Sequence, residues 1–196
     1  MNTRPTFNTV GVVGAGAMGR GIAQIACQAG SHVLLLDTQP EAVAQARAAL
    51  HQQWDKQLEK GRMDAATVAD CKARLLAAAQ TADLARCDLV VEAIVERLEV
   101  KRSLFADLEN HVDAQAVLVT NTSSLSVTAI AAGLKHPQRF AGYHFFNPVP
   151  LMKVVEVIAG LKTDAGVCER LSAFAREMGH TPVQAQDTPG FIVNHA

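Results

Sequence analysis

The sequence of 196 residues is poor in the features that mark several large classes of protein. Only 5% of the residues are aromatic, and 18 Lys and Arg residues nearly balance 19 Asp and Glu residues. This composition disfavours a nucleic-acid binder, because such proteins present basic surfaces and aromatic platforms for bases. No run reaches the roughly 18 apolar residues of a membrane span, and the N-terminal segment lacks the apolar core of a signal peptide. We therefore expect neither nucleic acid nor a membrane as a partner.

The four cysteines are equally unpatterned. Cys27, Cys71, Cys87 and Cys168 show neither a CxxC spacing nor the paired clustering that a disulfide framework or a zinc site needs. We interpret them as reduced thiols of a cytoplasmic protein and expect no bound metal. What the sequence does have is 49% hydrophobic residues, enough for a full core.

Strand-like and helix-like patterns alternate along the chain. Short apolar runs rich in β-branched residues, as at 9–13 and 32–36, are typical of buried parallel strands. Residues 39–60 and 64–78 have helical spacing and predict a helical hairpin, which is longer than a crossover between two strands requires. We therefore predict an α/β fold of the Rossmann type: a doubly wound, mostly parallel sheet with a helical-hairpin insertion and antiparallel strands at the C-terminal end.

A glycine-rich turn joins the first predicted strand to the first predicted helix. In Gly14-x-Gly16-x-x-Gly19 the first glycine permits the tight turn, the second lets a pyrophosphate approach, and the third lets helix pack on strand. Asp37 ends the second strand about 20 residues later, where a carboxylate accepts from a ribose 2′-hydroxyl and repels a 2′-phosphate. Arg20 is a contrary sign, because it could meet that phosphate. We expect NAD, rather than NADP, as the cofactor.

Polar residues follow three successive predicted strands of the sheet. Glu96 follows one strand, residues 121–124 follow the next, and His144 and Asn147 stand at the end of a third. Ligands of open parallel sheets bind beyond the carboxyl ends of the strands. The repetition therefore predicts a ligand site at that edge of the sheet.

His144 and Glu156 each have two interpretations. A histidine among aromatic neighbours is either a core residue or an acid–base group. Glu156 interrupts an apolar strand, so its carboxylate either faces solvent or is buried with a partner. If the two strands form a hairpin across the turn at 148–150, the side chains meet and the carboxylate fixes the imidazole tautomer.

Two further sets of polar residues are also open to two interpretations. Ser123 and Ser124 either cap the following short helix or belong to the ligand site, and no G-x-S-x-G elbow supports a serine nucleophile. Lys56 and Lys60 lie on one face of the long predicted helix, with Arg62 beyond it. They form either a solvated surface or a clamp for a phosphorylated part of a substrate.

Several segments, taken together, resemble the L-3-hydroxyacyl-CoA dehydrogenase family. They occur in this order between residues 9 and 194: GAGAMGRGIAQ, Asp37, EAIVERLEVK, TNTSSLSVTAIA, RFAGYHFFNPVPLMKVVEVI and DTPGFIVN. The HFFNPVP and NTSSL segments are specific to that family, whereas the glycine motif is shared more widely. The resemblance implies oxidation of a 3-hydroxyacyl-CoA to the 3-keto form with NAD as hydride acceptor, in fatty-acid or aromatic-acid degradation.

The resemblance also implies roles for individual residues. His144 is expected to be the general base, with Glu156 as its carboxylate partner. Ser123 and Asn194 are expected to hold the substrate oxygens, and Lys56 and Lys60 to meet the CoA moiety. The expected cofactor side comprises Gly14, Gly16, Ala17, Met18, Gly19, Asp37, Glu96, Lys101, Ser123 and Asn147.

The domain organisation is a further expectation from the resemblance. Residues 1–187 are expected to form the NAD-binding domain, and residues 188–196 to begin a helix leading to an all-helical domain of roughly 100 residues that this sequence does not contain. In the family that domain forms the homodimer and closes over the acyl chain, so an acyl-CoA and a second subunit are the expected partners. The alternatives are a non-catalytic NAD-binding module, a truncated domain that lacks turnover without its helical domain, or a hydroxy-acid dehydrogenase that does not use CoA.

Overall fold

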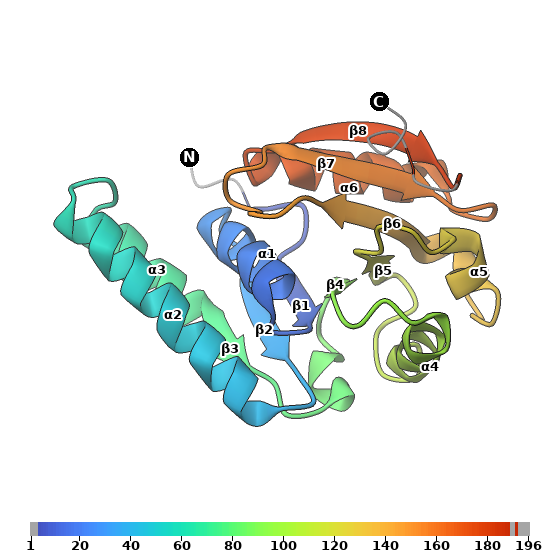
Figure 1. The fold of residues 1–196 in the computed structure, drawn as a ribbon, viewed down its shortest axis with the longest axis horizontal. Coiled ribbons are helices and arrows are strands. Elements are labelled where there is room, and N and C mark those ends of the chain that lie inside the picture. The colour runs from blue at the N-terminus through green and yellow to red at the C-terminus, as the bar shows by residue number, and fades with distance from the viewer. Residues whose placement is uncertain (1–3, 189–190, 192–196) are drawn as a thin grey trace.

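A computed structural model describes residues 4–188 and 191 of the chain, which fold around an eight-stranded sheet (Figure 1). The strands are Thr9–Val13 (β1), His32–Leu36 (β2), Leu75–Ala77 (β3), Leu89–Glu92 (β4), Val117–Thr120 (β5), Phe140–Phe145 (β6), Val154–Ala159 (β7) and Thr181–Gln186 (β8). Their order across the sheet is β3-β2-β1-β4-β5-β6-β7-β8. The first six strands run parallel, while β7 pairs antiparallel with β6 and parallel with β8. The predicted sheet is confirmed.

Helices cover both faces of the sheet. They are Ala17–Gln28 (α1), Pro40–Glu59 (α2), Ala65–Arg74 (α3), Leu98–Leu108 (α4), Val127–Ala131 (α5) and Ala165–Glu177 (α6), with 3₁₀ turns at Thr81–Leu84 (η1) and Pro137–Arg139 (η2). Apolar side chains of α1, α2, α3 and α6 form a core on one face, and those of α4 and α5 form a second core on the other. Among the described residues, none of the helices has the length and apolar character needed to span a bilayer. All four cysteines are buried and unpaired.

The predicted helical hairpin is present, but its second helix is shorter than expected. In Figure 1, α2 and α3 stand along the side of the sheet where β3 lies. Asp64 caps α3 as predicted, accepting a hydrogen bond from the Thr67 backbone N–H at 2.7 Å. The helix ends at Arg74 rather than near residue 78, because the next three residues pair with β2 as strand β3. That pairing satisfies backbone groups at the edge of β2, which outweighs the local helical spacing.

The C-terminal part of the sheet is the hairpin that the site depends on. β6 and β7 pair antiparallel, with His144 directly opposite Glu156. α6 then returns the chain to β8, which lies at the edge of the sheet. The helix expected over residues 188–196 falls outside the described residues apart from Thr188 and Phe191.

Candidate active site

The turn between β1 and α1 has no room for a side chain at two of its three glycines, whereas the third glycine borders free space. Gly14 has a φ of +109°, and a Cβ there would lie 2.4 Å from the carbonyl oxygen of Ala93. A Cβ on Gly19 would lie 1.7 Å from the carbonyl oxygen of Gly14. At Gly16, a Cβ would have no atom within 4 Å among the described residues beyond its chain neighbours. The backbone is therefore accessible at the N-terminus of α1, where N–H groups and the helix dipole favour a phosphate.

Asp37 borders a cleft of about 420 Å³ beside this turn. Its Oδ2 accepts a hydrogen bond from the Ala15 backbone N–H at 2.8 Å, and its Oδ1 accepts one from that of Gln39 at 3.0 Å. A carboxylate has about four acceptor positions, so Asp37 can hold the turn and still accept from a ribose hydroxyl. Arg20 does not line this cleft but lies in a separate hollow beside α1. The arrangement fits NAD better than NADP.

His144 and Glu156 meet inside the β6–β7 hairpin. Nδ1 of His144 lies 2.8 Å from Oε2 of Glu156. Only 7% of His144 is exposed, and none of Glu156. When Nδ1–H donates to the carboxylate, the neutral ring keeps an unprotonated Nε2, which can take up a proton. The carboxylate would also stabilise the imidazolium that results, so the pair has the geometry of a general base.

A cleft of about 340 Å³ opens in front of His144. It brings together several of the expected site residues from different strand ends. Its lining residues are Met18, Ala93, Ile94, Glu96, Asn121, Ser123, His144, Phe145, Phe146 and Asn147. Ala93 and Ile94 also line the cleft of Asp37, so the two cavities meet at the loop after β4. Asn194, the other residue expected to hold the substrate, lies outside the described residues.

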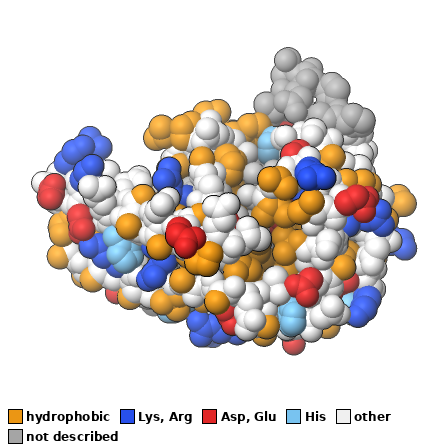
Figure 2. Space-filling model, turned by 60° about the horizontal axis from the view of Figure 1, so that its bottom comes forward, with side chains coloured by type: hydrophobic (Ala, Val, Ile, Leu, Met, Phe, Trp, Pro, Cys, Tyr) orange, Lys and Arg blue, Asp and Glu red, His pale blue; other side chains and the backbone are white. Residues whose placement is uncertain are grey.

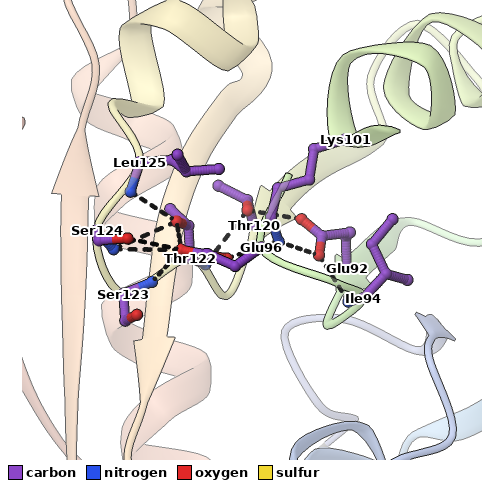
Figure 3. A network of polar contacts seen from close by, with 9 residues as sticks. All are labelled: Glu92, Ile94, Glu96, Lys101, Thr120, Thr122, Ser123, Ser124 and Leu125. Carbon is purple, nitrogen blue, oxygen red and sulfur yellow. Dashed lines mark hydrogen bonds and ion pairs between the residues drawn. The ribbon is translucent and has the colours of Figure 1, made fainter. Parts of the chain in front are cut away.

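Glu96 holds the loop that carries Ser123 (Figure 3). Its Oε1 accepts hydrogen bonds from the backbone N–H of Ser123 at 3.0 Å and of Ser124 at 3.3 Å, and one from the Thr122 hydroxyl. Partial burial raises the pKa of the Glu96 carboxyl. The Thr122 hydrogen bond and the charge of Lys101 outweigh this effect, so the pKa lies below its ordinary value. Glu96 is thus a charged acceptor at neutral pH.

Ser123 and Ser124 are not the caps of the following helix. The N-cap of α5 is Ser126, whose hydroxyl oxygen accepts a hydrogen bond from the Ala129 N–H at 3.1 Å. Ser123 is instead exposed and lines the cleft of His144. Of the two interpretations of these serines, the structure supports the one that places Ser123 at the ligand site.

Lys101, expected on the cofactor side, is fully buried on α4 and is not among the residues that line either cleft. Its Nζ lies 2.5 Å from Oε1 of Glu92 and 3.2 Å from Oε2 of Glu96. The ammonium faces two carboxylates, because a buried charge needs such partners. A direct contact between Lys101 and a cofactor stays a prediction; within the protein, Lys101 is linked to the cleft of His144 through Glu96.

A groove continues from the cleft of His144 toward the α2–α3 hairpin. Asn147 borders both the cleft and a hollow beside α1, and that hollow shares Gln24, Gln53 and Leu151 with a larger hollow of about 560 Å³. Arg62 lines this last part. Lys56, on α2, and Lys60, directly after α2, are exposed and are not among its lining residues. Figure 2 shows Lys and Arg side chains gathered over the outer end of the hairpin.

The sequence did not predict a role at the site for several polar residues. The sequence pattern assigns Glu92 to a buried strand at 88–94, Thr120 to the end of a strand at 116–120, and Thr122 to the polar run at 121–124. Asp187, which caps α5 from a distance, carried no local signal. A carboxylate inside an apolar strand does indicate a buried partner. That rule identified Glu156, and applied to Glu92 it would have predicted a buried partner without naming Lys101.

Comparison with known proteins agrees with the family resemblance of the sequence. Residues 9–188 match the family model described as 3-hydroxyacyl-CoA dehydrogenase, NAD binding domain. The chain is 47% identical over 186 residues to 3-hydroxyadipyl-CoA dehydrogenase of Escherichia coli K12, covering 95% of this chain and 39% of that protein. It is 40% identical over 185 residues to 3-hydroxybutyryl-CoA dehydrogenase of Bradyrhizobium diazoefficiens, covering 94% and 63%. A crystal structure of 3-hydroxybutyryl-CoA dehydrogenase from E. coli K12 superposes with a TM-score of 0.94 at 47% identity, over 96% of this chain and 40% of that chain.

Proposed function

The chain belongs to the NAD-binding domain family of the 3-hydroxyacyl-CoA dehydrogenases, and from this premise we propose that it oxidises an L-3-hydroxyacyl-CoA to the 3-keto form. It spans about two fifths of the length of the first relative named above. The observation that carries the proposal is the buried contact of 2.8 Å between His144 Nδ1 and Glu156 Oε2, at a cleft next to the glycine turn. An imidazole held in this way is suited to remove a hydroxyl proton.

The chain's own residues account for the proton in this reaction. NAD, when bound, supplies the hydride acceptor. Nε2 of His144 takes the proton of the 3-hydroxyl as the C3–H bond breaks, which leaves a C=O double bond at C3. Glu156 balances the imidazolium charge, so no isolated charge is left in a buried position. The Ser123 hydroxyl is placed to donate a hydrogen bond to the oxygen at C3.

The glycine turn and the two clefts suit the binding of NAD. Gly16 leaves room for a pyrophosphate beside Ala17, and Asp37 faces the cleft that would hold the adenosine. Met18 and Asn147 line the cleft of His144, where the nicotinamide has to lie for hydride transfer. The base and the place where the hydride acceptor would lie thus share one cleft.

The CoA part of the substrate has a place in the groove that leads to the helical hairpin. The groove runs from Asn147 along α1 to Arg62. Lys56 and Lys60 stand exposed on the same hairpin. Cations there suit the phosphates of CoA, and this favours a CoA substrate over a free hydroxy acid.

The proposal also covers the domain organisation, the assembly and the cellular compartment of the protein. Residues 1–187 act as the cofactor domain, and the acyl chain is covered by helices that follow this domain. The active form is a homodimer assembled through those helices. The protein works in a reducing cytoplasm, which the four buried, unpaired cysteines support.

The experiment is a test of His144 in turnover and in cofactor binding. Reduction of acetoacetyl-CoA is followed by loss of NADH absorbance, and NADH binding by its fluorescence. We expect His144→Asn to lower turnover by about 10²–10⁴-fold with little change in NADH affinity. The control is His111→Asn, since His111 lies at the end of α4 against Asp107. A fully active His144→Asn variant contradicts the assigned role. NADH binding without turnover in this chain, but with turnover in a form extended by the helical domain, indicates a truncated enzyme; no turnover in either form favours a non-catalytic module.

A further inference from the structure

We propose that Glu92, a residue that lines neither cleft, is a positioning residue that sets the place of Ser123 through Lys101 and Glu96. The side chain of Glu92 is fully buried at the end of β4. It has no contact with either cavity, so it is not a catalytic residue. This inference deepens the proposed function, because it rests on the cleft of His144 being the reaction site.

Glu92 joins three separate parts of the fold. Its Oε1 accepts hydrogen bonds from the Ile94 backbone N–H at 2.7 Å and from Lys101 Nζ at 2.5 Å. Its Oε2 accepts the Thr120 hydroxyl at 2.7 Å. One carboxylate thus ties together the loop after β4, helix α4 and the end of β5 (Figure 3).

The chain of contacts continues from Lys101 to the cleft. Lys101 Nζ also lies 3.2 Å from Oε2 of Glu96. The other oxygen of Glu96 accepts the N–H groups of Ser123 and Ser124. Thr122, fully buried, donates its hydroxyl to that same oxygen. The ammonium of Lys101 is therefore the bridge between a carboxylate that is wholly inside the protein and one that holds the serine loop.

The energetics of this cluster favour a positional role over a simple stabilising one. Burial of an ion pair costs desolvation energy that the pair often does not recover, so apolar residues would stabilise the core at least as well. Two carboxylates and one ammonium are nonetheless placed here, between two core-forming elements. What they add is direction: charge-assisted hydrogen bonds fix the angle and distance of their partners more narrowly than apolar packing does.

The location of the tied loops shows what is being positioned. Ile94, whose N–H is held by Glu92, lines both the cleft of Asp37 and that of His144. Ser123, at the other end of the chain of contacts, lines the cleft of His144. A shift of Glu92 would therefore move the wall shared by the two halves of the cofactor site and the hydroxyl that faces the substrate.

The test is Glu92→Gln, with Glu99→Gln as the matched control. Glutamine has nearly the same shape, but its NH₂ group must face either Thr120 or the Ile94 and Lys101 donors. Glu99 is exposed on the same helix as Lys101, and its carboxylate lies 3.9 Å from the Arg102 guanidinium. The readouts on this chain are the NMR amide shifts, the affinity for NADH by fluorescence, and the melting temperature.

We expect Glu92→Gln to shift the amide signals of Ser123 and Ser124 as well as Ile94, and to weaken NADH binding by about tenfold. Glu99→Gln should leave all of these unchanged. A lower melting temperature with unmoved Ser123 and Ser124 signals and unchanged NADH affinity would show a merely structural role and overturn the proposal.

A second variant covers the case in which Glu92→Gln does not fold. Thr120→Val keeps the shape and the buried charges but removes the hydrogen bond to Glu92 and the bond that the hydroxyl oxygen accepts from the Thr122 N–H at 3.3 Å. We expect smaller shifts of the same amide signals, and the Ile94 signal reports on Glu92 because Ile94 is held by Glu92 and not by Thr120. Unmoved signals in this variant would count against the proposal. None of these readouts requires turnover. A failure to oxidise hydroxyacyl-CoA, both in this chain and in a form extended by the helical domain, would therefore contradict the proposed function and still leave this result interpretable.

Discussion

At the scale of single residues, the three glycines of the turn before α1 are required for different reasons. A side chain on Gly19 would overlap the carbonyl oxygen of Gly14, whereas one on Gly16 would enter open space. Gly16 also has a φ of −69°, which any residue adopts without strain. Steric overlap within the fold therefore explains Gly19, whereas Gly16 meets no such overlap and leaves its space free for a ligand.

This difference gives a prediction for two matched variants. Gly19→Ala should destabilise the fold by about 2–3 kcal/mol through overpacking, which lowers the melting temperature by roughly 4–12 °C. Gly16→Ala should melt like the unaltered chain but bind NADH about tenfold more weakly or worse, since the methyl group takes the space of the pyrophosphate. Thermal melting and NADH fluorescence measure the two effects. Equal melting temperatures for both variants would contradict the steric argument, and undiminished NADH binding by Gly16→Ala would contradict the assigned phosphate site.

The buried acidic residues show how far sequence reasoning reaches at this scale. Glu156 breaks an apolar strand that follows a histidine strand across a short turn, so its partner could be named in advance. Glu92 breaks another such strand, but its partner Lys101 lies on a helix, and the contact depends on how α4 packs on the sheet. The pairing register of two strands in a hairpin can be predicted from the sequence. The way a helix packs on a sheet cannot be predicted in this way, because no such register exists.

At the scale of elements, local patterns predicted most strands and helices, and long-range pairing decided the remainder. The spacing of apolar residues predicted α2 within a residue of each end, because the helix buries one face. It extended α3 too far, since Leu75 continues the helical spacing yet pairs with Val33 of β2. A strand of three residues at the edge of a sheet forms only by pairing with its neighbouring strand, so the local sequence does not predict it.

Asp187 makes a second long-range contact, in which its side chain links the end of β8 to the N-terminus of α5. Its carboxylate accepts hydrogen bonds from the backbone N–H groups of Val127 at 2.9 Å and Thr128 at 2.7 Å, and from the Ser126 hydroxyl at 2.7 Å. Partial burial raises the pKa of Asp187, but the hydrogen bonds from Thr128, Ser126 and Val127 lower it more, so the pKa lies below its usual value. The chain leaving the sheet is thereby held next to the loop that carries Ser123.

This arrangement predicts a stability difference that depends on pH. A folded-state pKa below the unfolded value of about 3.9 contributes stability above that pH, which is lost as the pH falls through the folded pKa. Asp187→Asn should therefore lower the free energy of unfolding by about 1 kcal/mol at pH 7, after allowance for solvent screening. The difference from the unaltered chain should shrink as the pH falls below about 4.

Urea unfolding between pH 7 and pH 3 measures this difference. Asp164→Asn is the control, because Asp164 is the N-cap of α6 but makes no capping hydrogen bond with its side chain. It should cost little at any pH. A difference for Asp187→Asn that stays constant down to pH 3 would show that the carboxylate charge is not what holds α5.

At the scale of the whole molecule, the site lies where three parts of the chain meet. The β1–α1 turn and Asp37 form one side, and the β6–β7 hairpin with His144 forms the other. The loops after β4 and β5 lie between them and line the shared wall. The sequence predicted that strand ends would gather at this edge, because parallel strands place their carboxyl ends together. It did not predict the groove toward the hairpin, which arises from the packing of α1 and α2 against the turn after β6.

That groove gives the last prediction, which concerns how a CoA substrate is held. Arg62 lines the groove, and Lys56 and Lys60 are exposed on the hairpin nearby. At low salt, replacing each of these residues by alanine should weaken CoA binding by about twofold to fivefold. Arg62→Ala should have the largest effect, because its side chain borders the groove itself. The effects should fade at high ionic strength, where the Debye length falls to about 3 Å at 1 M salt.

Calorimetric titration of CoA at two salt concentrations measures this effect, with Lys162→Ala as the control. Lys162 is exposed but lies beyond β7, beside a separate pocket near α5. If the hairpin cations hold the CoA phosphates, only the hairpin variants lose affinity, and they lose it mainly at low salt. If Lys162→Ala weakens binding as much as Arg62→Ala does, the attraction comes from the overall charge of the protein, and the groove is not the CoA site.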